Sequence, residues 1–104
     1  MKKVSQANEA HFLEQIPNVG KAVVHDLHLL GIQQPHDLKK RDAYQLYVAL
    51  CEKTRLYHDP CMLDTLIAAV YFMDGKGAKK WWDFTIERKA RFHEVEAQVK
   101  IFKR

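Results

Sequence analysis

The chain has 104 residues, of which 47% are hydrophobic and 29% charged, and its formal net charge at pH 7 is +4. This length allows one domain of ordinary size and excludes a catalytic domain joined to a separate recognition domain. The composition is that of a folded chain. Residues 1–6 do not resemble a secretory signal, and the longest apolar run, residues 66–73, is too short to span a bilayer. We therefore expect a cytoplasmic protein.

Apolar residues recur with helical periodicity along almost the whole chain, and no segment alternates apolar and polar residues long enough to indicate a strand. We therefore predict an all-α protein, a compact helical bundle. Its helices are expected at about residues 6–14, 21–30, 42–52, 60–73 and 78–104. Gly31 is expected to end the second of these, and Asp42 to cap the third.

A tight turn is expected between the first two helices, at Ile16-Pro17-Asn18-Val19-Gly20-Lys21. Proline fixes φ, and Asn18 and Gly20 are residue types that tolerate positive φ. The turn leads directly into a helix whose first N–H groups have no partner within the helix, and such groups attract anions. The sequence thus predicts a phosphate-binding hairpin formed by Pro17, Asn18, Val19, Gly20 and Lys21.

The positive charge is unevenly distributed along the chain. Basic and acidic residues balance in residues 1–52, so the whole excess lies in residues 53–104. Its densest part includes Lys79 and Lys80 and could track a phosphate backbone. For any single lysine, a solvated helix surface is the simpler interpretation.

The last predicted helix carries a narrow apolar stripe at Phe92, Val95, Val99 and Phe102. Such a stripe packs back on its own chain or pairs with a second copy. We favour packing back over a homodimer through the C-terminal helix, because barely two heptads are present.

Two cysteines, Cys51 and Cys61, are expected to be unpaired thiols because the chain shows no sign of secretion. Together with His58 and a second histidine they could form a zinc site, but their spacing does not fit a zinc finger. The pair Asp59-Pro60 is explained without a metal as a helix N-cap and first residue. We therefore expect no metal and no cofactor.

The segment 12–38 resembles a helix-hairpin-helix motif. The matching residues are Ile16, Pro17, Val19, Gly20, Val24, Leu27, Gly31 and Ile32, whereas Asn18 replaces the first glycine. Over residues 10–90 the chain resembles the small bacterial helix-hairpin-helix proteins of the pathogenicity-locus and mitomycin-resistance family. The residues that carry this wider resemblance are the hairpin, His58-Asp59-Pro60-Cys61, Ala69-Val70-Tyr71-Phe72, and Trp81-Trp82 with Lys89.

The resemblance implies a SAM-like, pseudo-duplicated core over residues 1–75, with the motif at 12–32. By analogy, residues 51–60 would form a degenerate second hairpin, which lacks the glycine turn but supplies Lys53 and Arg55. Residues 76–104 would be a basic, aromatic helical extension packed on this core as a long C-terminal helix.

We expect DNA to be the partner, bound without sequence specificity and in the context of DNA repair or damage resistance. The expected contacts are Pro17, Asn18, Val19, Gly20, Lys21, Lys53, Arg55, Lys79 and Lys80. The alternative is a protein-interaction module that uses Trp81, Trp82 and the C-terminal helix, although a tryptophan pair more often anchors a core. We expect no enzyme, because glycosylases that share this hairpin need a second domain to form a base pocket. The residues leave the choice between DNA and RNA open.

Overall fold

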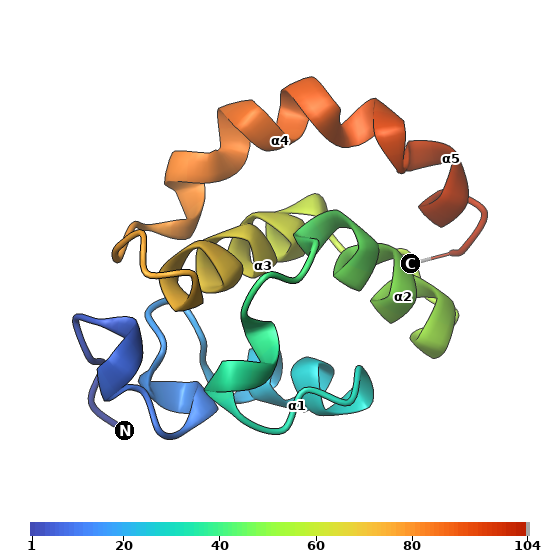
Figure 1. The fold of residues 1–104 in the computed structure, drawn as a ribbon. Coiled ribbons are helices and arrows are strands. Elements are labelled where there is room, and N and C mark those ends of the chain that lie inside the picture. Colours follow the sequence, from blue (N-terminus) through green and yellow to red (C-terminus); the bar gives the residue numbers. More distant parts are fainter. Residues whose placement is uncertain (104) are drawn as a thin grey trace.

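The central element of the fold is helix α3 (Pro60–Met73), in a computed structural model that describes residues 1–103. Apolar side chains cover most of its circumference, and its residues 63–70 are all buried. Helix α2 (Ala43–Thr54) packs along it, and the C-terminal segment arches over both (Figure 1). Helix α1 (Lys21–Leu29) lies on the opposite side of α3 from this arch.

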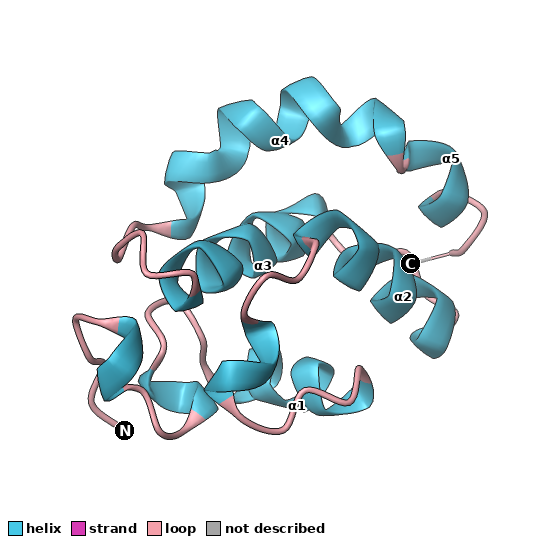
Figure 2. Cartoon of the chain, in the orientation of Figure 1, coloured by secondary structure: helices cyan, strands magenta, loops and turns pink. Residues whose placement is uncertain are grey.

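All the regular structure of residues 1–103 is helical, apart from one isolated bridge between Leu56 and Lys103 (Figure 2). The prediction of an all-α protein is therefore confirmed. None of the described helices is long and apolar enough to cross a membrane.

The local signals at three helix ends act as predicted. The Asp42 carboxylate accepts hydrogen bonds from the N–H groups of Tyr44 and Gln45 at the start of α2. At the start of α3, Asp59 caps the helix and Pro60 is its first residue. Gly31 follows α1 with a φ of 81°, the left-handed conformation that glycine adopts at low cost.

The prediction of a helix at residues 6–14 is wrong. In its place are two short 3₁₀ turns, Ala7–Glu9 and Leu13–Gln15, joined by extended backbone at Ala10. The side chains of Glu9 and Gln15 each accept a hydrogen bond from the main-chain N–H three residues earlier. These local bonds close single turns and compete with a continuous helix.

The C-terminal segment is also not the single long helix that was expected. It consists of a 3₁₀ turn (Trp81–Phe84), helix α4 (Thr85–Arg91), a second 3₁₀ turn (Phe92–Glu94) and helix α5 (Glu96–Val99). The breaks let the segment curve around α3 and α2 while it keeps its apolar side chains against them (Figure 1). The buried residues of this segment are Phe84, Arg88, Phe92, Val95 and Val99.

The apolar stripe of the C-terminal segment therefore packs on the chain's own core. Phe92, Val95 and Val99 belong to the same cluster of buried residues as α2 and α3. Pairing of two chains through these side chains would first require this core to open, and the homodimer stays a prediction.

Candidate nucleic-acid interface

The predicted hairpin is a tight turn that two apolar side chains anchor in the core. Ile16 and Val19 are both completely buried, and the N–H of Val19 donates to the carbonyl of Ile16 at 3.1 Å. Between them Asn18 has a φ of 73°, the left-handed conformation that this position requires. Asparagine tolerates this conformation better than most residues, which explains how it can stand where the motif has glycine. Because the Val19 N–H is bonded internally, it is not available to a phosphate, contrary to expectation.

The N-terminus of α1, by contrast, is open. Gly20 occupies its N-cap position, so no side chain caps the helix. Within the described part of the chain, the main-chain N–H groups of Gly20, Lys21 and Ala22 make no hydrogen bond. All three residues are exposed. A Cβ built on Gly20 would meet no atom within 4 Å, and its φ of −102° suits any residue. The glycine therefore leaves the helix N-terminus accessible without being required by packing.

The Asn18 side chain links the hairpin to a segment more than 60 residues later in the chain. Its Nδ2 donates to the carbonyl of Lys79 at 2.7 Å, and its Oδ1 accepts a hydrogen bond from the N–H of Trp81 at 3.2 Å. These two bonds place Lys79 and Lys80, both exposed, beside the hairpin. The segment of Lys79 and Trp81 thus contacts the hairpin through Asn18 and not through the N–H groups of α1.

A further lysine that the sequence did not indicate lies against the hairpin. The Lys3 ammonium donates to the carbonyl of Glu14 at 2.8 Å and to the carbonyl of Val19. Partial burial lowers the pKa of Lys3, and the nearby Glu14 carboxylate opposes this shift. Lys3 therefore links the residues before the turn to its end at Val19, and it adds positive charge close to the turn.

Aromatic rings accompany the lysines next to the hairpin. The Lys79 ammonium lies 5.2 Å from the centroid of the Tyr71 ring, and the Lys80 ammonium lies 5.8 Å from that of Trp82. Trp81 and Trp82 meet edge to face, with ring centroids 5.4 Å apart. Trp81 is partly buried, whereas 55% of the Trp82 surface is exposed.

Lys53 and Arg55, the two remaining predicted contacts, lie elsewhere. They end α2 and precede α3, whereas Lys79 follows the other end of α3, a helix about 21 Å long at 1.5 Å per residue. Figure 1 shows the end of α2 and the loop before α4 on opposite sides of the molecule. The Arg55 guanidinium lies 5.4 Å from the Phe102 ring, near the C-terminus. The structure therefore brings Pro17–Lys21 together with Lys79 and Lys80, but not with Lys53 and Arg55.

The cysteines and His58 do not converge. Cys51 is buried, Cys61 is exposed, and both are unpaired. Burial raises the pKa of each thiol, and the neighbouring Asp59 adds to this effect at Cys61. The His58 ring nitrogen Nε2 instead lies 2.8 Å from the Thr54 hydroxyl. Among residues 1–103 no group of three or more His, Cys, Asp and Glu residues could hold a metal ion.

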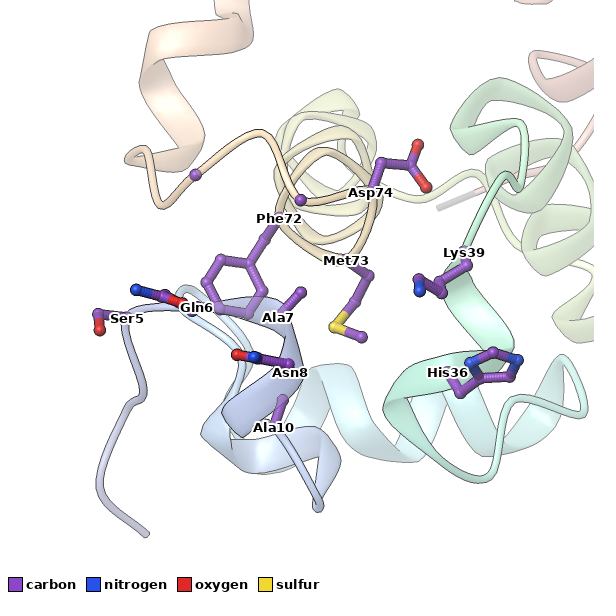
Figure 3. Close-up of a pocket in the computed structure, with 12 residues that line it drawn as sticks. Ser5, Gln6, Ala7, Asn8, Ala10, His36, Lys39, Phe72, Met73 and Asp74 are labelled. Carbon is purple, nitrogen blue, oxygen red and sulfur yellow. The ribbon is translucent and has the colours of Figure 1, made fainter.

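A cavity of about 510 Å³ lies between the N-terminal segment and the end of α3. Figure 3 shows Phe72 and Met73 on the same side of the cavity as the N-terminal segment, with His36 and Lys39 at the opposite side. The lining residues of that segment are Ser5, Gln6, Ala7, Asn8 and Ala10. The Asp74 carboxylate at its edge accepts a hydrogen bond from the Lys40 N–H at 2.7 Å. The lining mixes polar and apolar groups.

Comparisons with known proteins support the resemblance seen in the sequence. The family model described as "Pathogenicity locus" matches residues 6–90. The chain is 36% identical over 77 residues to the mitomycin resistance protein McrB of Streptomyces lavendulae, a match that covers 74% of this chain and 73% of that protein. No solved structure matches the chain.

Proposed function

We propose that this chain, which belongs to the pathogenicity-locus family, binds DNA through its phosphate backbone at the N-terminus of α1. The observation that carries the proposal is the uncapped and exposed start of this helix, next to the turn in which Asn18 bonds to the main chain of Lys79 and Trp81. We further propose damage resistance as the biological setting, since the relative from S. lavendulae is named for resistance to mitomycin.

The chemistry of this surface suits an anion with several charges in a row. Three exposed N–H groups at the positive end of the α1 dipole can donate to the oxygens of one phosphate. The ammonium groups of Lys21, Lys79 and Lys80 can neutralise adjacent phosphates. Contacts to phosphate carry no information about the bases, so the binding is expected to be independent of sequence.

Fluorescence anisotropy with labelled duplex DNA at several salt concentrations tests the proposal. For roughly two to four neutralised phosphates, we expect micromolar or weaker affinity and a slope of log K against log salt of about −2 to −4. Absence of binding at low ionic strength, or binding that does not respond to salt, would contradict the proposal.

Two substitutions locate the site on the surface. Gly20→Val places a branched side chain over the N–H groups of α1, in space that is empty, so binding should be lost while the protein stays folded. Lys79→Gln should weaken binding and lower the salt slope by about one. Lys53→Gln removes the same charge at the far end of α3 and is the matched control, with little expected effect.

A second candidate function, a protein-interaction module, is favoured by two exposed apolar side chains. Trp82 is 55% exposed, and Ile86 on α4 is 85% exposed. Neighbouring apolar side chains at the surface are a feature of protein-binding sites. If this function holds, Ile86→Asp should abolish capture of the partner and leave DNA affinity unchanged or slightly lower.

A further inference from the structure

The two tryptophans next to the hairpin differ in their exposure to solvent. Trp81 is partly buried, and its main-chain N–H donates to the Oδ1 of Asn18. Trp82 makes an edge-to-face contact with Trp81, at an interplanar angle of 84°, and more than half of its surface is exposed. Trp81 thus fixes the position of Trp82, which offers an aromatic surface beside the candidate phosphate site.

The charges around Trp82 indicate what this surface can bind. The Lys80 ammonium lies 5.8 Å from the Trp82 ring centroid, and Lys79 is the residue before Lys80. The Asp83 carboxylate is the acidic group closest in sequence, and it accepts a hydrogen bond from the Lys80 main-chain N–H at 3.3 Å. An aromatic ring flanked by flexible cations is typical of sites where a nucleic-acid base stacks while its phosphate is neutralised.

We infer that Trp82 stacks on an unpaired base of the strand whose phosphate is held at the N-terminus of α1. In a duplex the faces of the bases are covered by their neighbours, so only a single-stranded, flapped or frayed nucleotide can present a face to Trp82. The protein therefore prefers DNA with unpaired bases to blunt duplex. This inference rests on the proposed DNA binding and adds a structural preference to it.

Tryptophan fluorescence gives a direct measurement of stacking. In the Trp81→Phe variant, Trp82 is the only tryptophan, and a phenyl ring still supports it. Titration at low salt with single-stranded oligothymidine should quench its emission, whereas blunt duplex of the same length should quench it much less. Equal quenching by both, or quenching by neither, overturns the inference.

Affinities of Trp82 variants separate stacking from charge. Trp82→Leu should weaken binding of the single strand about fivefold or more, since stacking contributes about 1–3 kcal/mol per base. It should leave blunt duplex almost unaffected. Trp82→Phe should keep most of the single-strand affinity, and Ile86→Ala, which removes a neighbouring exposed apolar side chain, is the matched control. Because Trp82 is mostly exposed, thermal unfolding should verify that each variant is folded.

The outcomes distinguish this inference from the proposed function. If duplex binds with the expected salt dependence but Trp82→Leu does not change single-strand affinity, DNA binding stands and stacking is wrong. If no DNA of any form binds at low salt, the proposed function itself is wrong, and the inference with it.

Discussion

Helices α1 and α3 both follow a non-glycine residue with positive φ, but α1 begins without a capping side chain, whereas a carboxylate caps the start of α3. Asn18, with a φ of 73°, precedes α1, and Arg55, with a φ of 59°, precedes α3. At α1 the N-cap is Gly20, which has no side chain to offer. At α3 the Asp59 carboxylate accepts a hydrogen bond from the Cys61 N–H at 2.8 Å.

The difference shows why only one of these turns is a candidate phosphate site. The carboxylate at the start of α3 occupies the position that an anion would take, and its charge repels a second anion. At α1 the same position is open, and the turn before it is joined to the main chain of Lys79. A second hairpin at residues 51–60, as the resemblance implies, would therefore contribute positive side chains but not a helix N-terminus that holds phosphate.

The largest loss of stability is expected from breaking the ion pair that fixes the C-terminal segment to α3. This segment contacts both turns. Arg88 on α4 pairs with the completely buried Asp64, with 2.8 Å between Nε and Oδ1, and the Thr85 hydroxyl donates to the same carboxylate. Asp64→Ala leaves the Arg88 charge buried without its partner, so the free energy of unfolding should fall by about 3–5 kcal/mol. Urea denaturation measures this loss.

An exposed ion pair on the same segment is the control for Asp64→Ala. Arg91 and Glu94 also pair, at 3.0 Å, but both side chains are more than 40% exposed. Glu94→Gln should change stability very little, because water and salt screen exposed pairs. If Asp64→Ala is as stable as Glu94→Gln, the buried pair of Arg88 and Asp64 does not stabilise the segment, which is then held by its apolar contacts alone. The comparison of the two turns then does not depend on this pair.

The next effect, in order of size, concerns the positive φ itself. Asn18→Gly keeps the conformation but removes the hydrogen bonds to Lys79 and Trp81, which should cost about 1–2 kcal/mol. Asn18→Ala should cost about 1 kcal/mol more, because alanine is strained at this φ. Arg55→Gly should cost less than Asn18→Gly, since Arg55 contributes one contact with an aromatic ring. Equal losses at Asn18 and Arg55 in urea denaturation would mean that the Asn18 bridge does not stabilise the fold.

Parts of the fold that depend on neighbouring residues could be predicted from the sequence. Helix α3 begins at Asp59-Pro60 as expected, and Gly31 follows the end of α1, because caps and helix ends are encoded within a few residues. The two 3₁₀ turns at the N-terminus were missed, because a short apolar period does not reveal that Glu9 and Gln15 bond back to the main chain.

The candidate site was predicted only where it is local. The turn at Asn18 and the open Gly20 follow from residue types in one pentapeptide. The bridge from Asn18 to Lys79, the placement of Lys3 and the burial of Asp64 with Arg88 join residues that are 11 to 61 positions apart. No pattern in a single sequence specifies such pairs, so the grouping of the predicted lysines could not be foreseen.

The smallest change in stability is expected from making the two N-termini alike. Gly20→Asp gives α1 the cap that α3 has, in a position where the added side chain meets no neighbour and the backbone needs no change. It should stabilise the protein by a few tenths of a kcal/mol, while Asp59→Ala at α3 should cost about 1 kcal/mol. The same Gly20→Asp carboxylate would occupy the N–H groups of α1 and repel phosphate, so DNA affinity should fall at least tenfold. Gly20→Asn is the control, because it caps the helix without adding charge and should reduce affinity less. A Gly20→Asp variant that is folded and binds DNA as tightly as the parent protein would show that the phosphate is not held at α1, and that the difference between the two turns has no bearing on binding.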